Sequence, residues 1–269
     1  MSGEQAGRGN AGFLMPAKRT ASRRPATRGK SVAALRQTPT SPTNLGPHEE
    51  AMADVIARRL EEDIVLGRRH PRERLIEQDL CECFDTHRGD VRLALFDLEK
   101  KGIVQRIPNR GAIVRDLTPR EVMDIYAVRE ELEVMAARIL PFPIAPSSFT
   151  KLEQLQERHS AAIDKDDMLG VFYANLDFHQ TLFGFCGNLC LIDTIKTLEQ
   201  KVYGIRFYAN AFPEALSRAR LDHFEMVEAL RASRRDDLIE LTRRHLKPSP
   251  EAYIRAYERR FGGASAASG

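Results

Sequence analysis

Long hydrophobic runs are missing from this chain, tryptophan is absent and cysteine is scarce. No apolar stretch approaches the about 20 residues that a membrane-spanning helix needs. The first fifteen residues lack the apolar centre of a secretory signal peptide. The four cysteines occur as Cys81-x-Cys83 and Cys186-x-x-x-Cys190, which fits neither a disulfide scaffold nor paired zinc knuckles. These absences argue against a membrane protein or a disulfide-stabilised secreted domain, and we expect a cytoplasmic protein without a membrane partner.

Acidic residues are almost absent from the first 47 residues, which contain eight lysines and arginines and only Glu4 as an acid. The whole chain has a net charge of +3, so the rest of it, with 33 basic and 37 acidic side chains, is net negative. A uniformly basic folded part is therefore excluded. Residues 100–115 are the exception, with no acid and five basic residues: Lys100, Lys101, Arg106, Arg110 and Arg115. Such a local basic patch is typical of a small nucleic-acid contact.

Residues 1–47 also lack apolar periodicity and are rich in Gly, Ala, Ser, Thr, Pro and Arg, which predicts a disordered basic tail. Two interpretations of this tail stay open. The first is a segment without a role of its own, either a solvated leader or the product of a gene start placed upstream of Met15. The second is a basic arm that attracts phosphate groups. Residues 261–269 are predicted to form a second disordered tail.

Residues 67–114 have the pattern of a winged helix-turn-helix. A helix is expected over residues 87–102, with a buried stripe formed by Val91, Leu95 and Leu98. Arg88 and Arg92 are four residues apart and share another face near the start of this helix. Two β-like runs follow at residues 103–107 and 112–116, and the turn between them carries Arg110. In this motif the helix enters the major groove and the hairpin contacts the backbone or the minor groove.

Further helices are expected on both sides of this motif. Helices over residues 49–66 and 76–84 complete a winged helix-turn-helix domain at residues 48–117. The sequence Thr118-Pro-Arg-Glu121 is a capping box, which starts a helix. Only helical patterns follow, over residues 119–140, 149–163, 166–185, 188–209, 213–232, 236–246 and 251–260. The predicted fold class is therefore mainly α, with an all-helical bundle at residues 118–260 as the second domain.

Residues 67–111 resemble the GntR family of bacterial transcription regulators. The matching residues are Gly67, Arg74-Leu75, Glu77, Leu80, Arg88, Val91-Arg92, Ala94-Leu95, Leu98, Gly102-Ile103-Val104 and Arg110-Gly111. His87 and Asp90 depart from the family pattern, which has serine and proline at these positions. The resemblance implies a homodimer that binds a palindromic operator in double-stranded DNA. It also implies DNA contacts by five residues: Arg74, Arg88, Arg92, Arg110 and Gly111.

Three histidines lie on the apolar stripes of three different predicted helices: His179, His223 and His245. A single histidine in such a place is usually a core residue with a hydrogen-bond partner. Three of them in one bundle would be costly to bury unpaired, and a divalent metal ion such as zinc would satisfy all three. Asn175 lies one turn before His179 on the same face and is a candidate for a fourth, weaker oxygen ligand.

The helical part resembles the FCD effector-binding domain of the FadR branch of the same family. The resemblance rests on Arg129 with Glu133, on Asn175 with His179, on Gly187-Asn188, and on the later His223 and His245. It implies a metal site formed by Asn175, His179, His223 and His245, although the family usually has Asp where this chain has Asn175. It also implies that a small metabolite, such as an organic acid, binds beside the metal.

A carboxylate effector needs a cationic anchor, and Arg129 is the expected one because arginine can bind a carboxylate through two N–H groups. The alternative for Arg129 is a structural salt bridge with a neighbouring acid. Arg206, beside Tyr203, Phe207 and Tyr208, is a second candidate for the anchor.

Together these features predict a ligand-responsive transcriptional regulator, a repressor, without enzymatic activity. Two alternatives stay open. One is a metal sensor, in which the ion itself is the effector. The other is a metal-dependent hydrolytic enzyme, although the sequence lacks an H-E-x-x-H motif and an obvious general base.

Overall fold

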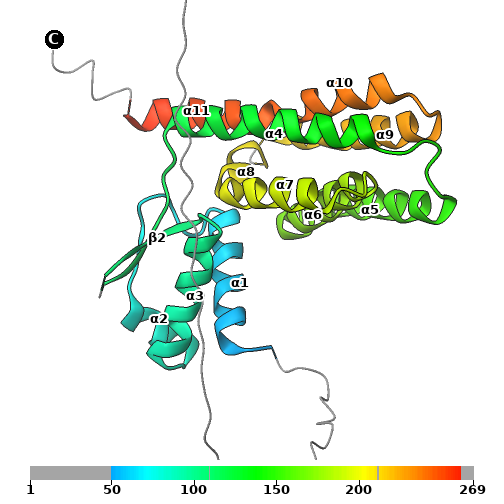
Figure 1. The fold of residues 1–269 in the computed structure, drawn as a ribbon. Coiled ribbons are helices and arrows are strands. Elements are labelled where there is room, and N and C mark those ends of the chain that lie inside the picture. The colour runs from blue at the N-terminus through cyan, green and yellow to red at the C-terminus, as the bar shows by residue number, and fades with distance from the viewer. Residues whose placement is uncertain (1–49, 109, 211, 262–269) are drawn as a thin grey trace, which may run out of the picture. The chain divides into compact units, whose positions relative to one another are not determined.

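The computed structural model describes residues 50–108, 110–210 and 212–261 of the chain (Figure 1). The predicted tail at residues 1–47 lies outside these residues, and so do residues 262–269 of the second predicted tail. Phe261, with which that tail was expected to begin, is instead the last residue of a helix. None of the described helices combines the length and the apolar character that crossing a membrane requires.

Residues 50–117, which we call the head, contain three helices and a small sheet. The helices are α1 (Met52–Val65), α2 (Glu77–Phe84) and α3 (Arg88–Lys100). The strands are β1 (Arg74–Leu75), β2 (Val104–Ile107) and β3 (Gly111–Val114), and they form an antiparallel sheet in the order β1-β3-β2. Val104 pairs with Val114 across the hairpin, and Arg74 pairs with Ile113. The predicted helix-turn-helix and hairpin are therefore present, with β1 as an additional strand.

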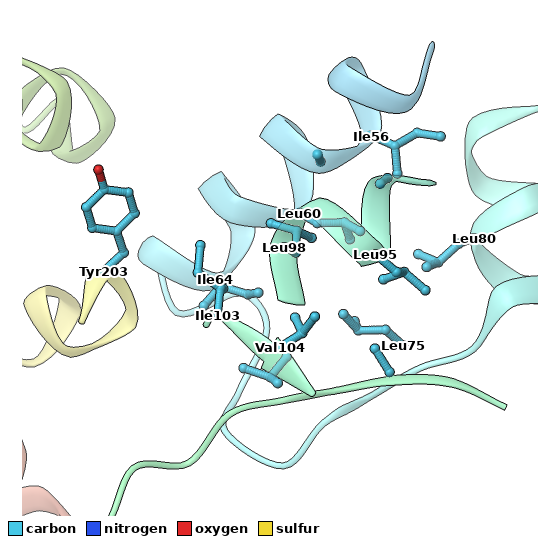
Figure 2. Close-up of a cluster of buried hydrophobic side chains, with 14 of the residues drawn as sticks. Ile56, Leu60, Ile64, Leu75, Leu80, Leu95, Leu98, Ile103, Val104 and Tyr203 are labelled. Carbon is cyan, nitrogen blue, oxygen red and sulfur yellow. The ribbon is translucent and has the colours of Figure 1, made fainter. Parts of the chain in front are cut away.

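The head has its own core, which lies between α1, α3 and the sheet (Figure 2). The stripe Val91, Leu95 and Leu98 is buried as predicted, and it packs against Ile56 and Leu60 of α1. Burying each such side chain stabilises the fold by roughly 1.5–3 kcal/mol. This packing fixes the direction in which α3 presents its other, exposed face.

Residues 118–261, which we call the bundle, are helical as predicted. Their helices are α4 (Pro119–Ile139), α5 (Pro146–Asp164), α6 (Met168–Gly184), α7 (Leu189–Lys201), α8 (Tyr203–Asn210), α9 (Pro213–Arg231), α10 (Arg235–Leu246) and α11 (Pro248–Phe261). The capping box at the start of α4 is confirmed, because the Thr118 hydroxyl accepts from the Glu121 N–H and the Glu121 carboxylate accepts from the Thr118 N–H. The mainly α fold class is also confirmed.

Three helix assignments in the bundle differ from the prediction by three residues or more, and one of them is the helix expected from residue 251, which begins at Pro248. The helix expected over residues 188–209 is two helices, α7 and α8, because the backbone of the fully buried Val202 leaves the helical conformation. The helix expected from residue 149 begins at Pro146, which takes the first helical position, where a missing N–H costs nothing. The break at Val202 matters for function, because it reorients the chain just before Tyr203 and Arg206.

Two bundle helices contribute side chains to the core of the head. Phe172 of α6 and Tyr203 of α8 both belong to it, and their rings meet edge to face with centroids 5.1 Å apart. Figure 2 shows Tyr203 at the edge of the cluster, on the side of Ile64. The hydroxyl of Tyr173 on α6 donates a hydrogen bond of 3.1 Å to Glu62 of α1. The head and the bundle are therefore in direct contact through α6 and α8.

Candidate functional site

The exposed face of α3 carries the two arginines that the sequence singled out. Arg88 is the first residue of the helix and Arg92 follows one turn later, and both side chains are exposed. The same face also presents Leu93 and Phe96, which are 52% and 39% exposed. Sequence reasoning missed these two apolar residues, although both fall outside the buried stripe of α3. Exposed apolar side chains on such a helix can contact the methyl group of thymine.

The arginines around α3 divide into paired and unpaired groups. Arg92 forms an ion pair of 2.9 Å with Glu77, and Arg106 of the wing forms one of 3.2 Å with Glu99. Within the described part of the chain, no ion-pair partner is found for the three other exposed arginines of the head's α3 side: Arg74, Arg88 and Arg110. These three side chains are therefore the ones immediately available to a phosphate or a base.

The carboxylate of Asp90, which stands where the family has proline, is held by a hydrogen bond within the head. Its carboxylate accepts a hydrogen bond of 2.7 Å from the hydroxyl of Thr86, in the turn before α3. The acid thereby fixes the turn between α2 and α3. A carboxylate in the first turn of a helix also interacts favourably with the helix dipole.

Gly111 has a conformational role at the base of the wing. It is buried at the start of β3 and has φ of +94°, a value that residues other than glycine rarely adopt. A Cβ atom there would lie 2.0 Å from the carbonyl oxygen of Leu75. Gly111 therefore lets β1 and β3 approach each other and shapes the wing, while Arg110 is the exposed residue of the turn.

The structure brings together His179 of α6, His223 of α9 and His245 of α10. The Nε2 atom of His179 lies 2.9 Å from Nε2 of His245 and 3.2 Å from Nε2 of His223. His179 and His223 are buried, and His245 is half-buried. Burial, together with the charge of neighbouring groups, holds the pKa values of His179 and His223 well below the usual 6.5, so both rings are neutral at pH 7.

This donor set fits a divalent metal ion. Nitrogen ligands about 2.0–2.1 Å from a tetrahedral zinc ion are about 3.3 Å apart, close to the separations found here. Neutral imidazoles present the lone pairs that such an ion needs. Asn175 of α6 lines the same cavity one turn before His179, where its amide oxygen could complete the set.

Asp222 supports this cluster from outside, and sequence reasoning missed it. Its carboxylate is 1% exposed, and Oδ2 lies 3.4 Å from Nδ1 of His245, the ring nitrogen that faces away from the other histidines. Burial acts to raise the pKa of Asp222, but hydrogen bonds from His245 and Arg244 outweigh it and lower the pKa. Such a carboxylate fixes the tautomer and the orientation of a metal-binding histidine.

Four buried charges form a balanced network beside the histidines. Arg129 of α4 donates to Glu133 through Nε at 3.1 Å and through Nη2 at 2.8 Å. Arg206 of α8 donates to Glu199 of α7 at 3.1 Å, and Arg129 lies 3.7 Å from the same carboxylate. Burial raises the pKa of Glu133, while Arg129 opposes that shift. The salt bridge considered as an alternative for Arg129 is therefore present, and both arginines also line the cavity.

A fourth histidine, His159 of α5, is buried and lines the same cavity. Its ring centroid lies 4.6 Å from that of His223. The sequence offered one signal for it, since His159 continues the buried stripe of α5 through Leu152 and Leu155.

Comparison with known proteins agrees with this architecture. A profile described as "Bacterial regulatory proteins, gntR family" matches residues 52–114, and one described as "FCD domain" matches residues 124–248. The HTH-type transcriptional repressor RspR of Escherichia coli is 29% identical over 189 residues, which are 69% of this chain and 82% of that protein.

Two solved structures share the fold. McbR/YncC of Escherichia coli has a TM-score of 0.67 at 20% identity and covers 77% of this chain and 99% of its own. A GntR regulator described as putative, from a Rhodococcus species, has a TM-score of 0.65 at 20% identity and covers 76% and 98%. The chain is a DNA-binding transcriptional regulator of the GntR family, whose helical bundle is an FCD domain.

Proposed function

We propose that this regulator is a homodimeric repressor, which binds a palindromic operator and releases it when a small organic acid enters the bundle cavity. The observation that carries the proposal is the exposed face of α3, where Arg88 lies near the wing and its exposed turn residue Arg110. In the bundle of the same chain, His179, His223 and His245 converge. One short helix reads few base pairs, so two heads related by a two-fold axis would read two half-sites.

In this proposal α3 lies in the major groove. Arg88 and Arg92 read base edges or bind the adjacent phosphates, and Arg92 first exchanges its contact with Glu77 for a contact with DNA. Arg74, on β1, binds the backbone, and Arg110 reaches the backbone or the minor groove. Gly111 acts indirectly, through the shape of the wing.

The cavity would hold the metal ion through His179, His223, His245 and Asn175. A bound divalent ion supplies a Lewis-acidic attachment point for a carboxylate. The arginines and glutamates of the network balance each other, so they add little net charge to attract the acid. Arg129, held in place by Glu133, would offer its remaining N–H donors to the carboxylate and so fix its orientation.

Two side chains place the cavity next to the head. Phe172 lines the cavity and is also part of the core of the head. Tyr203 lies in that core as well, one helical turn before Arg206, which lines the cavity. A ligand that moves α6 or α8 would therefore move the packing against α1. This is allosteric control only if the ligand binds the DNA-competent and DNA-free states with different affinity.

The first test is fluorescence anisotropy of the full-length protein with DNA from upstream of its own gene, at two salt concentrations. We expect tight binding that weakens steeply with salt. Arg88→Ala should weaken operator binding by about 1–3 kcal/mol, as the loss of a base contact does. Arg158→Ala removes the same charge from the exposed surface of α5 and is the matched control. Equal, weak binding of all three proteins to any DNA would contradict the proposal.

A further inference from the structure

The head and the bundle are joined by a short connector, residues 115–118, which runs from the end of β3 at Val114 to the start of α4 at Pro119. Two domains joined in this way turn relative to each other unless further contacts hold them. The last helix of the bundle, α11, packs against α4 and α8. Its side chains also reach the connector and the head, and the function described so far gives these contacts no role.

Asp116 of the connector lies at the centre of these contacts. Its side chain is 4% exposed. Its Oδ1 atom accepts hydrogen bonds from two residues of α11, from the Tyr253 hydroxyl at 3.0 Å and from Nη2 of Arg260 at 3.3 Å. Its Oδ2 atom lies 2.7 Å from Nε of Arg72, in the loop before β1. Removing one partner of a buried ion pair is costly, so Asp116 ties this loop of the head to α11.

Two further contacts of α11 act in the same place. The Tyr253 hydroxyl also donates to the carbonyl oxygen of Leu117, the next residue of the connector, at 2.7 Å. The guanidinium of Arg72 lies over the ring of Phe261 at the end of α11, with 4.6 Å between Cζ and the ring centroid. A cation at this distance from an aromatic ring is attracted to it. Phe261 is 37% exposed, so its ring holds Arg72 at the surface rather than filling a core.

The backbone of Arg72 is anchored beside the wing. Its φ is +69°, a conformation that residues other than glycine rarely adopt. Its N–H donates a hydrogen bond of 2.9 Å to the carbonyl oxygen of Val114 on β3, the strand that pairs with both β1 and β2. A contact that holds Arg72 therefore also holds the sheet and its wing. We use the word clamp for the contacts of Asp116 and Arg72 with three residues of α11: Tyr253, Arg260 and Phe261.

The direction in which the heads point decides which operators a two-headed protein can bind. One additional base pair between two half-sites moves the second half-site by about 3.4 Å and turns it by about 34°. Heads that are held rigidly cannot follow this displacement. Loosely held heads can follow it, and they then bind both spacings with similar affinity.

We propose that the clamp sets the spacing between half-sites that this regulator accepts. Asp116, Arg260 and Phe261 are then positioning residues for operator recognition, which act through the direction of the head rather than by contact with DNA. The inference rests on the function proposed above, because two half-sites require a homodimer. It also connects the clamp with the effector cavity, since α11 begins with Pro248 and Ser249, which line that cavity.

The first experiment measures the affinity of the full-length protein for three DNA duplexes by fluorescence anisotropy. The duplexes are the operator located by footprinting upstream of its own gene, the same operator with one base pair inserted at its centre, and an isolated half-site. Asp116→Asn and Arg260→Gln weaken the clamp. Arg255→Gln is the matched control, because Arg255 pairs with Glu251 within α11 itself.

We expect the wild type and the control to prefer the native spacing by about tenfold, and the two clamp variants by about threefold or less. Affinity for the isolated half-site should stay within about twofold of wild type in every variant, because the residues that contact DNA are unchanged. A merely structural role would weaken binding to all three duplexes alike.

The second experiment measures the position of the head against the bundle without DNA. Cys83 of α2 and Cys190 of α7 are exposed and can carry nitroxide labels, in full-length protein in which Cys81 and Cys186 are replaced by alanine. Double electron–electron resonance of labelled protein diluted with unlabelled protein then gives the distance distribution within one protomer. We expect a narrow distribution for the wild type and the control, and a wider one for the clamp variants.

Phe261→Ala is included in both experiments, because it removes an exposed ring at the end of α11 and so tests the clamp even if Asp116→Asn does not fold. Unchanged distance distributions in the clamp variants would overturn the inference, and so would wider distributions with an unchanged spacing preference. An equal loss of affinity for the operator and for the isolated half-site would also overturn it. A footprint that covers a single half-site would instead contradict the proposed homodimer, and the spacing role would fail with it.

Discussion

Replacing Asp222 by asparagine should weaken metal binding although none of the proposed metal ligands is substituted. The change keeps the shape of the side chain but removes the anionic acceptor that lies 3.4 Å from His245 Nδ1. His245 would then be held less firmly in the tautomer that directs its Nε2 lone pair toward His179. Substitution of such supporting carboxylates typically lowers metal affinity 10–100-fold, which corresponds to about 1.4–2.7 kcal/mol.

Part of any effect of this change could come from Arg244, which donates to Asp222 at 2.6 Å and 3.0 Å. The control is Glu225→Gln, because Arg244 also pairs with Glu225 on the exposed surface of α9, away from His245. Both variants remove a carboxylate partner of Arg244, and only Asp222→Asn removes the partner of His245.

The assay is a competitive zinc titration against a chelating dye, at pH 7, for the wild type and both variants. We expect a dissociation constant at least tenfold higher in Asp222→Asn and within about twofold of wild type in Glu225→Gln. Metal affinity that is equal in all three proteins would refute the role assigned to Asp222. A loss of similar size in both variants would assign the effect to Arg244.

Three further predictions concern the contact between head and bundle, the pH dependence of stability, and the wing. Tyr173→Phe removes the hydrogen bond to Glu62, so it should lower the free energy of unfolding by about 1 kcal/mol and reduce the effect of the organic acid on operator affinity. In metal-free protein the neutral ring of His159 (pKa about 4) resists protonation, whereas the unfolded chain takes up a proton below pH 6.5. Stability in urea should therefore fall by about 2 kcal/mol from this residue between pH 7 and pH 5, and a smaller fall in His159→Leu than in the wild type is the expected signature. Gly111→Ala should lower the melting temperature clearly, because of its positive φ and the nearby carbonyl, whereas Gly89→Ala, with open space around it, should not; equal effects would contradict the role given to Gly111.

The head and the start of the bundle could be predicted in detail from the sequence because their signals are local. The stripe Val91, Leu95 and Leu98 repeats at helical spacing, and the capping box at Thr118 lies within four residues. The convergence of His179, His223 and His245 could also be anticipated, since each lies on an apolar stripe. These patterns need no knowledge of how distant helices pack.

The remaining features depend on tertiary contacts, which a single sequence does not reveal. The break between α7 and α8 at Val202 carries no proline or glycine, so the apolar pattern of the sequence continues through it. The break accompanies the packing of the next residue, Tyr203, into the core of the head. His159 is a lone histidine on its helix, and it comes to lie beside the other histidines only because α5 packs against α6 and α9. Asp222 supports His245 from 23 positions away in the chain, across two helices.

The most direct test of the central claim is operator affinity measured in four states of the same full-length protein. These are protein treated with chelator, zinc-loaded protein, and each of the two with a panel of small carboxylic acids, such as acetate and propionate, added. The account predicts tight operator binding by the zinc-loaded protein and at least tenfold weaker binding when the acid is also present, with no acid effect after chelation or in His179→Ala. A change that follows zinc alone would make the ion the effector. Operator affinity that is identical in all four states would contradict control of DNA binding by the bundle cavity.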